Sequence, residues 1–259
     1  MTDITLYQFP ISHYCEKVRW TLDWKGLDYK TCNLIPGFHI KTIGTLSRST
    51  ALPLLVKGDQ IIQGSAAILD YLDRLQPNPS LVQGSEAELQ QIQHWESRLD
   101  TEAGTAVRVF AYHYLLDRPD ILVLWLTTGS PAYKRWLFRL LFPKVAQVMR
   151  KKMRINAANA DVARQTVEAC LGEISEIYRS GRYLAGDHFS RADLTAAALF
   201  SPLFMPAGYG IDWGNTRRLP TKMLAWMDKH QADLNELAGI YERYRHLNTN
   251  NLTGASAIT

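Results

Sequence analysis

Residues 9–20 read FPISHYCEKVRW, and they mark the passage from a short apolar strand into an amphipathic helix. The strand is predicted over residues 4–9 and the helix over residues 13–25, whose apolar positions follow helical spacing. Ser12 and Cys15 fall at the helix start, where unpaired backbone N–H groups and the helix dipole stabilise a thiolate. The stretch predicts a site that handles a thiol. The alternative is that Ser12 is only an N-cap beside a buried Cys15.

A second informative stretch, residues 51–72, reads ALPLLVKGDQIIQGSAAILDYL. It predicts two strands joined by a Lys-Gly-Asp turn, followed by a helix that begins at Ser65. Together with the first strand and helix, the predicted order is strand–helix, a middle segment, and then strand–strand–helix.

This order and these motifs resemble the thioredoxin-like amino-terminal domain of the glutathione transferase superfamily. Further along, YLAGD at residues 183–187 precedes SRAD at residues 190–193. That pair is similar to the glycine-aspartate turn and capping box of the superfamily's helical domain, and Asp193 is interpreted as a structural cap. The resemblance covers most of residues 3–245. It implies the fold class of a glutathione transferase: an α/β thioredoxin-like N-terminal domain followed by an all-α helical C-terminal domain.

The composition along the chain suggests where the parts divide. Residues 1–76 are assigned to the thioredoxin-like, glutathione-binding domain. Residues 77–85 hold two prolines, which remove backbone donors and disfavour helix, so they are assigned to a linker. Residues 86–246 follow helical spacing and form the predicted substrate-binding domain. Residues 247–259 are polar and small and are predicted to be a frayed tail.

The resemblance also implies roles for individual residues. Ser12 occupies the position of the catalytic hydroxyl in serine-type members, which stabilises the thiolate of the co-substrate glutathione. The thiolate then attacks a hydrophobic electrophilic small molecule. Pro53 matches the superfamily's cis-proline, so Leu52 is expected to offer backbone groups to the cysteinyl part of glutathione. Ser65 is expected to bind the γ-glutamyl carboxylate.

Two positions depart from the family pattern. Gly64 stands where an acidic residue or glutamine is common, and Gln63 lies one residue earlier. Ala51 stands where lysine or glutamine is frequent. His39 and Lys41 are candidates for the glycyl carboxylate of glutathione. These departures predict a weakened grip on the tripeptide.

Three alternatives remain open on the sequence. Cys15 is a possible nucleophile, which would make the protein a glutathione thiol–disulfide exchanger. Tyr14 is a secondary candidate for the catalytic hydroxyl. A glutathione-transferase-like binding protein without useful catalysis is the third alternative, and Gly64 and Ala51 favour it.

The composition excludes several other classes. The chain has 259 residues, of which 46% are hydrophobic and 21% charged, with a net charge of +4, as in an ordinary globular protein. Its three cysteines suit free thiols in the cytoplasm, and its seven histidines show no metal-ligand spacing. We expect no metal, no nucleic acid partner and no membrane span. The family resemblance implies a homodimer with a role in detoxification.

A basic segment is the remaining unusual feature. Residues 121–160 contain no acidic residue, whereas residues 134–154 hold eight lysines and arginines among many apolar side chains. Pro143 predicts a kink or break. We expect Trp136, Leu140 and their apolar neighbours to face the core and the lysines to stay outside. Contact with a membrane surface through residues 134–154 is a less favoured alternative.

Overall fold

The computed structural model describes residues 3–245 and begins with a four-stranded mixed sheet. The elements in chain order are β1 (Ile4–Gln8), α1 (His13–Trp24), β2 (Lys30–Asn33), α2 (His39–Gly44), β3 (Leu54–Lys57), β4 (Gln60–Gln63) and α3 (Ser65–Leu75). The strand order is β2-β1-β3-β4, with β1 parallel to β2 and antiparallel to β3, and β4 antiparallel to β3. This arrangement confirms the thioredoxin-like prediction, including the strand pair and the helix that begins at Ser65.

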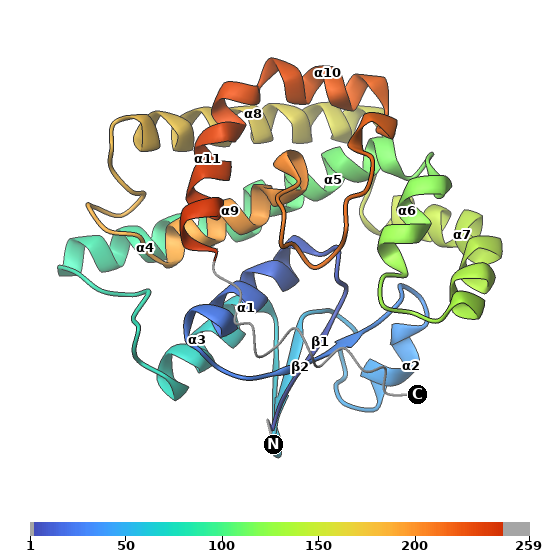
Figure 1. Ribbon diagram of the computed structural model, residues 1–259, viewed down its shortest axis with the longest axis horizontal. Helices are drawn as coiled ribbons and strands as arrows, with labels where there is room; N and C mark the ends of the chain where they lie inside the picture. Colours follow the sequence, from blue (N-terminus) through green and yellow to red (C-terminus); the bar gives the residue numbers. More distant parts are fainter. Residues whose placement is uncertain (1–2, 246–259) are drawn as a thin grey trace.

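The rest of the described chain is helical. It comprises α4 (Glu86–Arg98), a π-helical turn (Leu99–Ala103), α5 (Gly104–Leu115), α6 (Pro119–Leu126), α7 (Ala132–Lys152), α8 (Ala157–Arg179), α9 (Arg191–Phe204), a short 3₁₀ turn (Thr216–Arg218), α10 (Thr221–Lys229) and α11 (Gln231–Tyr244). Figure 1 shows the strands at the bottom and the helical part above and to the right. The predicted fold class is therefore confirmed. The domain limits at residues 76 and 86 remain a prediction, and the tail from residue 247 lies outside the described residues.

Helix α9 forms the centre of the helical part, because it is buried along nearly its whole length. The predicted capping box starts it: Asp193 Oδ2 accepts hydrogen bonds from the Ser190 backbone N–H and hydroxyl, at 2.9 and 2.8 Å. Its other oxygen accepts from the Leu184 N–H at 2.9 Å. These bonds fix the entry of the chain into α9 and commit Asp193 to a structural role.

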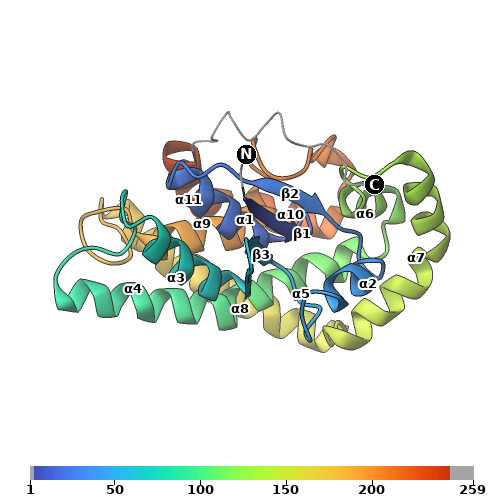
Figure 2. The same ribbon diagram turned by 90° about the horizontal axis from the view of Figure 1, so that it is seen from below.

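Helix α7 agrees with the prediction only in part. Pro143 lies inside it and the helix continues from Ala132 to Lys152 without a break, but Figure 2 shows a curved ribbon and not a straight helix. The expected buried face is right for Met149, which is buried, and wrong for Trp136 and Leu140, which are 65% and 58% exposed. Phe138 and Phe142 are buried instead, and the ring of Phe38 contacts Phe138. Apolar residues occupy several faces of α7, so spacing alone selected the wrong one.

The helical part holds α1 by buried ion pairs. Lys17 is fully buried on α1, and its ammonium lies 2.7 Å from a Glu96 oxygen and 2.8 Å from an Asp100 oxygen. On the same helix, both oxygens of the buried Glu16 are engaged, by Arg19 and by Arg245 near the end of the described chain. Removing one partner of such a buried pair is costly because the other charge stays in a low-dielectric interior. The start of α1 is therefore firmly placed.

Candidate functional site

A cavity of about 710 Å³ lies between the sheet side and the helical part. One wall comes from the loop before α1, the first residues of α1, the segment around α2 and the loop before β3. The other comes from α5, α6, α7 and the segment after α9. Figures 1 and 2 both show α2 beside α7 on the right-hand side. The cavity is large enough for a small organic ligand.

Ser12 lies at the boundary of this cavity and caps α1. Its Oγ accepts a hydrogen bond of 3.4 Å from the Cys15 N–H, and its own N–H donates to the Phe9 carbonyl at 2.9 Å. The side chain is half-buried and lines the cavity. The cap uses the oxygen as an acceptor, so a hydroxyl at this position can also act as a donor.

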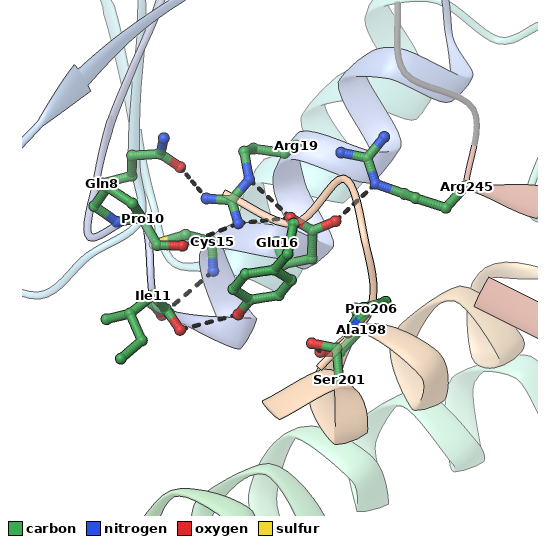
Figure 3. Close-up of polar contacts among 12 residues, drawn as sticks. Gln8, Pro10, Ile11, Cys15, Glu16, Arg19, Ala198, Ser201, Pro206 and Arg245 are labelled. Atoms are coloured by element: carbon green, nitrogen blue, oxygen red, sulfur yellow. Dashed lines mark hydrogen bonds and ion pairs between the residues drawn. The ribbon is translucent and has the colours of Figure 1, made fainter. Parts of the chain in front are cut away.

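A buried network holds the loop that carries Ser12 (Figure 3). The Arg19 guanidinium donates to Gln8 Oε1 at 2.5 Å, to the Pro10 carbonyl at 3.2 Å and to Glu16 Oε2 at 2.8 Å. Burial alone favours the neutral acid, but the Arg245 and Arg19 guanidiniums hold the pKa of Glu16 below its usual value. The loop is therefore fixed before any ligand binds, which is the preorganisation a catalytic hydroxyl needs.

Two tyrosine hydroxyls connect the loop before α1 and the start of α1 to the helical part. The Tyr209 hydroxyl donates to the Ile11 carbonyl at 2.9 Å. The Tyr14 hydroxyl donates to the Asp100 carbonyl at 2.7 Å, and burial raises the pKa of Tyr14 to about 12. Gly104 permits this approach, because a Cβ there would meet the Tyr14 hydroxyl oxygen at 2.6 Å. Although Tyr14 lines the cavity, its proton is engaged, so Ser12 has the freer hydroxyl.

His13, which the sequence reasoning passed over, also lines the cavity. Its Nε2 lies 3.0 Å from the Gly104 carbonyl, which fixes that nitrogen as the protonated one. Burial and, to a lesser degree, the charge of Arg108 lower the pKa of His13 to about 3. His13 is therefore neutral at physiological pH and links the Ser12 loop to α5.

Cys15 lies in a different environment. It is fully buried, does not line the cavity, and forms no disulfide. Burial raises its pKa, although the Ser12 hydroxyl partly opposes this. An attacking thiol needs exposure and a lowered pKa, and Cys15 has neither. Its surroundings favour a packing role.

The loop before β3 supplies the predicted backbone site. The Leu52–Pro53 bond is cis, as predicted, and Leu52 lines the cavity together with Ser12. The Pro53 carbonyl accepts a 3.0 Å hydrogen bond from the Gly64 N–H. Gly64, with a positive φ of 94°, is the N-cap of α3, so Ser65 is the first helical residue and not the cap. Ser65 is buried but is not among the residues that line the cavity, whereas Leu52 and Ser12 both are.

Gln63 is hydrogen-bonded within the protein, whereas His39 lines the cavity. The Gln63 side chain donates to the carbonyls of Ser49 and Ala51, at 2.9 and 2.6 Å, and accepts from the Ser47 hydroxyl at 2.8 Å. It therefore ties down the loop that leads to Leu52. His39 is half-buried and lines the cavity, and its Nδ1 accepts from the Gly37 N–H at 3.0 Å. That bond makes Nδ1 the acceptor and Nε2 the protonated nitrogen of the ring.

The helical wall is mainly apolar but carries three cations. Arg108 on α5 and Lys144 and Lys152 on α7 line the cavity, and no aspartate or glutamate is among its described lining residues. Lys144 and Lys152 were expected to stay outside, and both are exposed. Arg108 was missed, although it is the only lysine, arginine, aspartate or glutamate in α5. A single charge in an apolar helix was the available signal.

The chain is similar to known proteins in sequence and in fold. The family model described as "Glutathione S-transferase, N-terminal domain" matches residues 6–80. Glutathione S-transferase TCHQD of Arabidopsis thaliana is 25% identical over 208 residues, which cover 73% of this chain and 73% of the relative. A solved glutathione S-transferase from Rhodospirillum rubrum F11 has a TM-score of 0.62 at 23% identity and covers 98% of this chain and 96% of its own. The amino-terminal part thus matches the glutathione S-transferase family model, and the described chain as a whole has the glutathione S-transferase fold.

A further solved structure adds a ligand to the comparison. The theta class glutathione S-transferase from Xanthomonas axonopodis pv. citri, with glutathione bound, has a TM-score of 0.54 at 18% identity. The match covers 92% of this chain and 98% of that one. At this identity the likeness establishes the glutathione S-transferase fold, while the ligand is a property of that protein. Within residues 3–245, no helix is long and apolar enough to cross a membrane, and no cluster of three potential metal ligands occurs.

Proposed function

We propose that the protein is a glutathione transferase that joins the glutathione thiolate to a hydrophobic electrophile. The observation that carries the proposal is the position of Ser12, whose hydroxyl caps α1 and lines the cavity. A hydroxyl donor at a helix N-terminus lowers the pKa of a bound thiol by favouring its anion. A decrease of two pKa units needs only about 2.7 kcal/mol.

The reaction follows from that role. The thiol of bound glutathione loses its proton to solvent, and Ser12 donates a hydrogen bond to the resulting thiolate. The sulfur forms a bond to the electrophilic carbon, and the leaving group departs with the electrons of the bond that breaks. Tyr14 and Cys15 take no part in this scheme, because the first has its proton engaged and the second is buried.

The amino-terminal wall supplies the proposed glutathione contacts. Leu52 offers its backbone groups to the cysteinyl unit. Ser65 and the Gly64 turn at the α3 N-terminus favour the γ-glutamyl carboxylate. His39 donates from Nε2 to the glycyl carboxylate. Gln63 acts through the loop that it ties down and not by direct contact.

Two measurements on the purified protein test the proposal. Calorimetry with glutathione should show one site per chain, and an activated aryl chloride should form a thioether with release of chloride. Binding without thioether formation across several electrophile classes identifies the non-catalytic binding protein. Reduction of a mixed glutathione disulfide that is lost in Cys15→Ala identifies the thiol exchanger.

We also propose that the enzyme works in the cytoplasm as a homodimer, with a role in detoxification. The support is its superfamily, in which the amino-terminal domain of one subunit usually pairs with the helical domain of the other. Light scattering at micromolar concentration should give twice the chain mass, and a monomer would contradict the proposal.

A further inference from the structure

We infer that Arg108 is an anion-binding residue in the electrophile half of the cavity, and that the electrophile is an apolar molecule with a carboxylate. The inference rests on the proposed function and narrows its substrate class. Arg108 pairs with the carboxylate, and the apolar side chains around it hold the remainder of the molecule.

Arg108 is half-buried, and it differs in its partners from the buried cations of the described chain. Lys17, Arg19, Lys25, Arg191 and Arg245 are buried, and each lies within 2.8 Å of a carboxylate oxygen. Arg108 has no ion pair or hydrogen bond among residues 3–245, and its Nε is buried without an acceptor. Partial burial of a charge without a protein partner is unfavourable, and a bound anion would supply the missing partner.

The surroundings of Arg108 favour an anion over a neutral ligand. The described lining residues of the cavity include Lys144 and Lys152 but no acidic residue, so nothing in the cavity wall competes for the guanidinium. His13 beside it is neutral, since its pKa is about 3. Three positive charges around a low-dielectric space attract one negative charge strongly.

The shape of the guanidinium and its neighbours define the ligand further. A guanidinium donates two parallel hydrogen bonds to a carboxylate, which an ammonium cannot do. Val107, Ala111 and Leu115 on α5, and Val145 and Met149 on α7, line the space around it. An aromatic or aliphatic acid fits this combination. Arg108 lies on α5, a different element from the loops proposed for the carboxylates of glutathione.

The decisive experiment compares one electrophile with and without its charge. The probes are 4-chloro-3,5-dinitrobenzoate and its methyl ester, in which glutathione displaces chloride from the same ring. We expect Arg108→Met to lower the acid-to-ester ratio of kcat/KM by about 10-fold to 100-fold, the usual loss when a hydrogen-bonded charge partner is removed. Arg139→Met, which removes a charge from an exposed position of α7, should leave the ratio as it is.

A binding measurement keeps this inference separate from the proposed function. 3,5-Dinitrobenzoate has no chloride to displace, so its affinity is independent of turnover. We expect Arg108→Met to weaken its binding by a similar factor while glutathione binding stays unchanged. Arg108-dependent binding without any conjugation supports the anion site and refutes the transferase. An unchanged acid-to-ester ratio, or a selective loss of glutathione binding, overturns the anion site.

The variant is expected to fold, because no carboxylate loses its partner when Arg108 is removed. Thermal unfolding should show a midpoint at or above that of the unmodified protein, since a half-buried charge without a protein partner has been replaced by an apolar side chain. A lower midpoint would show that the guanidinium is satisfied within the protein, which also contradicts the inference.

Discussion

The two walls of the cavity are built on opposite principles. On the amino-terminal wall, the polar groups around Ser12 have partners within the protein. Arg19 and Gln63 hydrogen-bond to the loops that carry Ser12 and Leu52. His13 is hydrogen-bonded to the first residue of α5, and Tyr14 to the turn before it. On the helical wall, Arg108 is unpaired and lies among apolar side chains. The polar groups of the first wall have their hydrogen-bond partners without a ligand, whereas Arg108 on the second wall does not.

This difference teaches where rigidity and selectivity lie. A paired wall presents one fixed geometry, which suits a constant co-substrate and a hydroxyl that has to meet one sulfur atom. A wall with an unpaired cation gains most from a ligand that completes it, which suits discrimination among variable co-substrates. Changes on the first wall should therefore affect stability and overall rate, and changes on the second should affect preference.

The largest expected effect comes from the network behind the amino-terminal wall. Glu16→Gln removes the shared carboxylate of Arg19 and Arg245 and leaves two buried guanidiniums without it. The free energy of unfolding should fall by about 3 to 5 kcal/mol, as measured by urea denaturation. Asp3→Asn, which breaks an exposed pair with Lys57, is the control and should change little. Equal effects of the two changes would remove the contrast between the walls.

Ser12→Ala is expected to have the largest effect on catalysis. Loss of the thiolate donor should lower kcat/KM by about one to three orders of magnitude, while glutathione affinity changes little. The pH at which the rate is half-maximal should rise, because the bound thiol ionises less readily. Steady-state kinetics over pH and calorimetry check both effects. Full activity of Ser12→Ala, together with its loss in Cys15→Ala, would transfer the role to Cys15.

His13 should make the protein sensitive to acid. An unfolded histidine has a pKa near 6.5, whereas burial and Arg108 lower that of folded His13 to about 3. Between these values the unfolded chain binds a proton that the folded chain does not. The free energy of unfolding should therefore decrease as the pH falls below 6.5, by about 1.4 kcal/mol per pH unit, until pH 3 is approached. Denaturation across this range should show the slope reduced in His13→Gln and retained in His188→Gln, where an exposed histidine is replaced.

The smallest expected effect tests the electrostatic interaction between Lys152 on one wall and His39 on the other. Burial and, to a lesser degree, the charge of Lys152 lower the pKa of His39, although hydrogen bonds with the backbone of Ile35 and Thr50 oppose them. Lys152→Met should therefore raise the His39 pKa in an NMR titration, more at low salt than at high salt. Lys151→Met is the matched control, because Lys151 is the adjacent exposed residue and does not line the cavity. The same shift in both variants would mean that the general basicity of α7 acts on His39 and not the position of Lys152.

Much of the fold followed from local sequence signals, because turns, caps and strand alternation are short-range. The Pro53 segment, the Lys57–Gln60 turn and the Ser190 capping box are examples in which a few adjacent residues determine the structure. Ser12 was found from its place at a predicted helix start, whereas Leu52 and His39 followed from the resemblance to the superfamily. All three line the cavity.

The errors share a different cause. Which face of α7 is buried depends on the partner that covers it, and Phe38, which packs on Phe138, lies 100 residues earlier in the chain. The hydrogen bonds of Gln63 to its own loop, and the lack of an ion pair at Arg108 among the described residues, likewise depend on residues brought together by folding. A single sequence lists such side chains but not their neighbours, so the paired and unpaired groups of the site emerge only in three dimensions.

The π-helical turn between α4 and α5 has a consequence for how this cavity can change. Residues 86–115 form one continuous helical run, and the wider turn at Leu99–Ala103 sets the angular phase of α5 relative to α4. Each residue of an α-helix advances it by about 100°. Deleting one residue from this turn would rotate α5 about its own axis and move Arg108 away from the cavity, while Lys17 could keep its partner Glu96 on α4. A change in chain length, with no substitution in the cavity itself, is thus sufficient to exchange one set of lining residues for another.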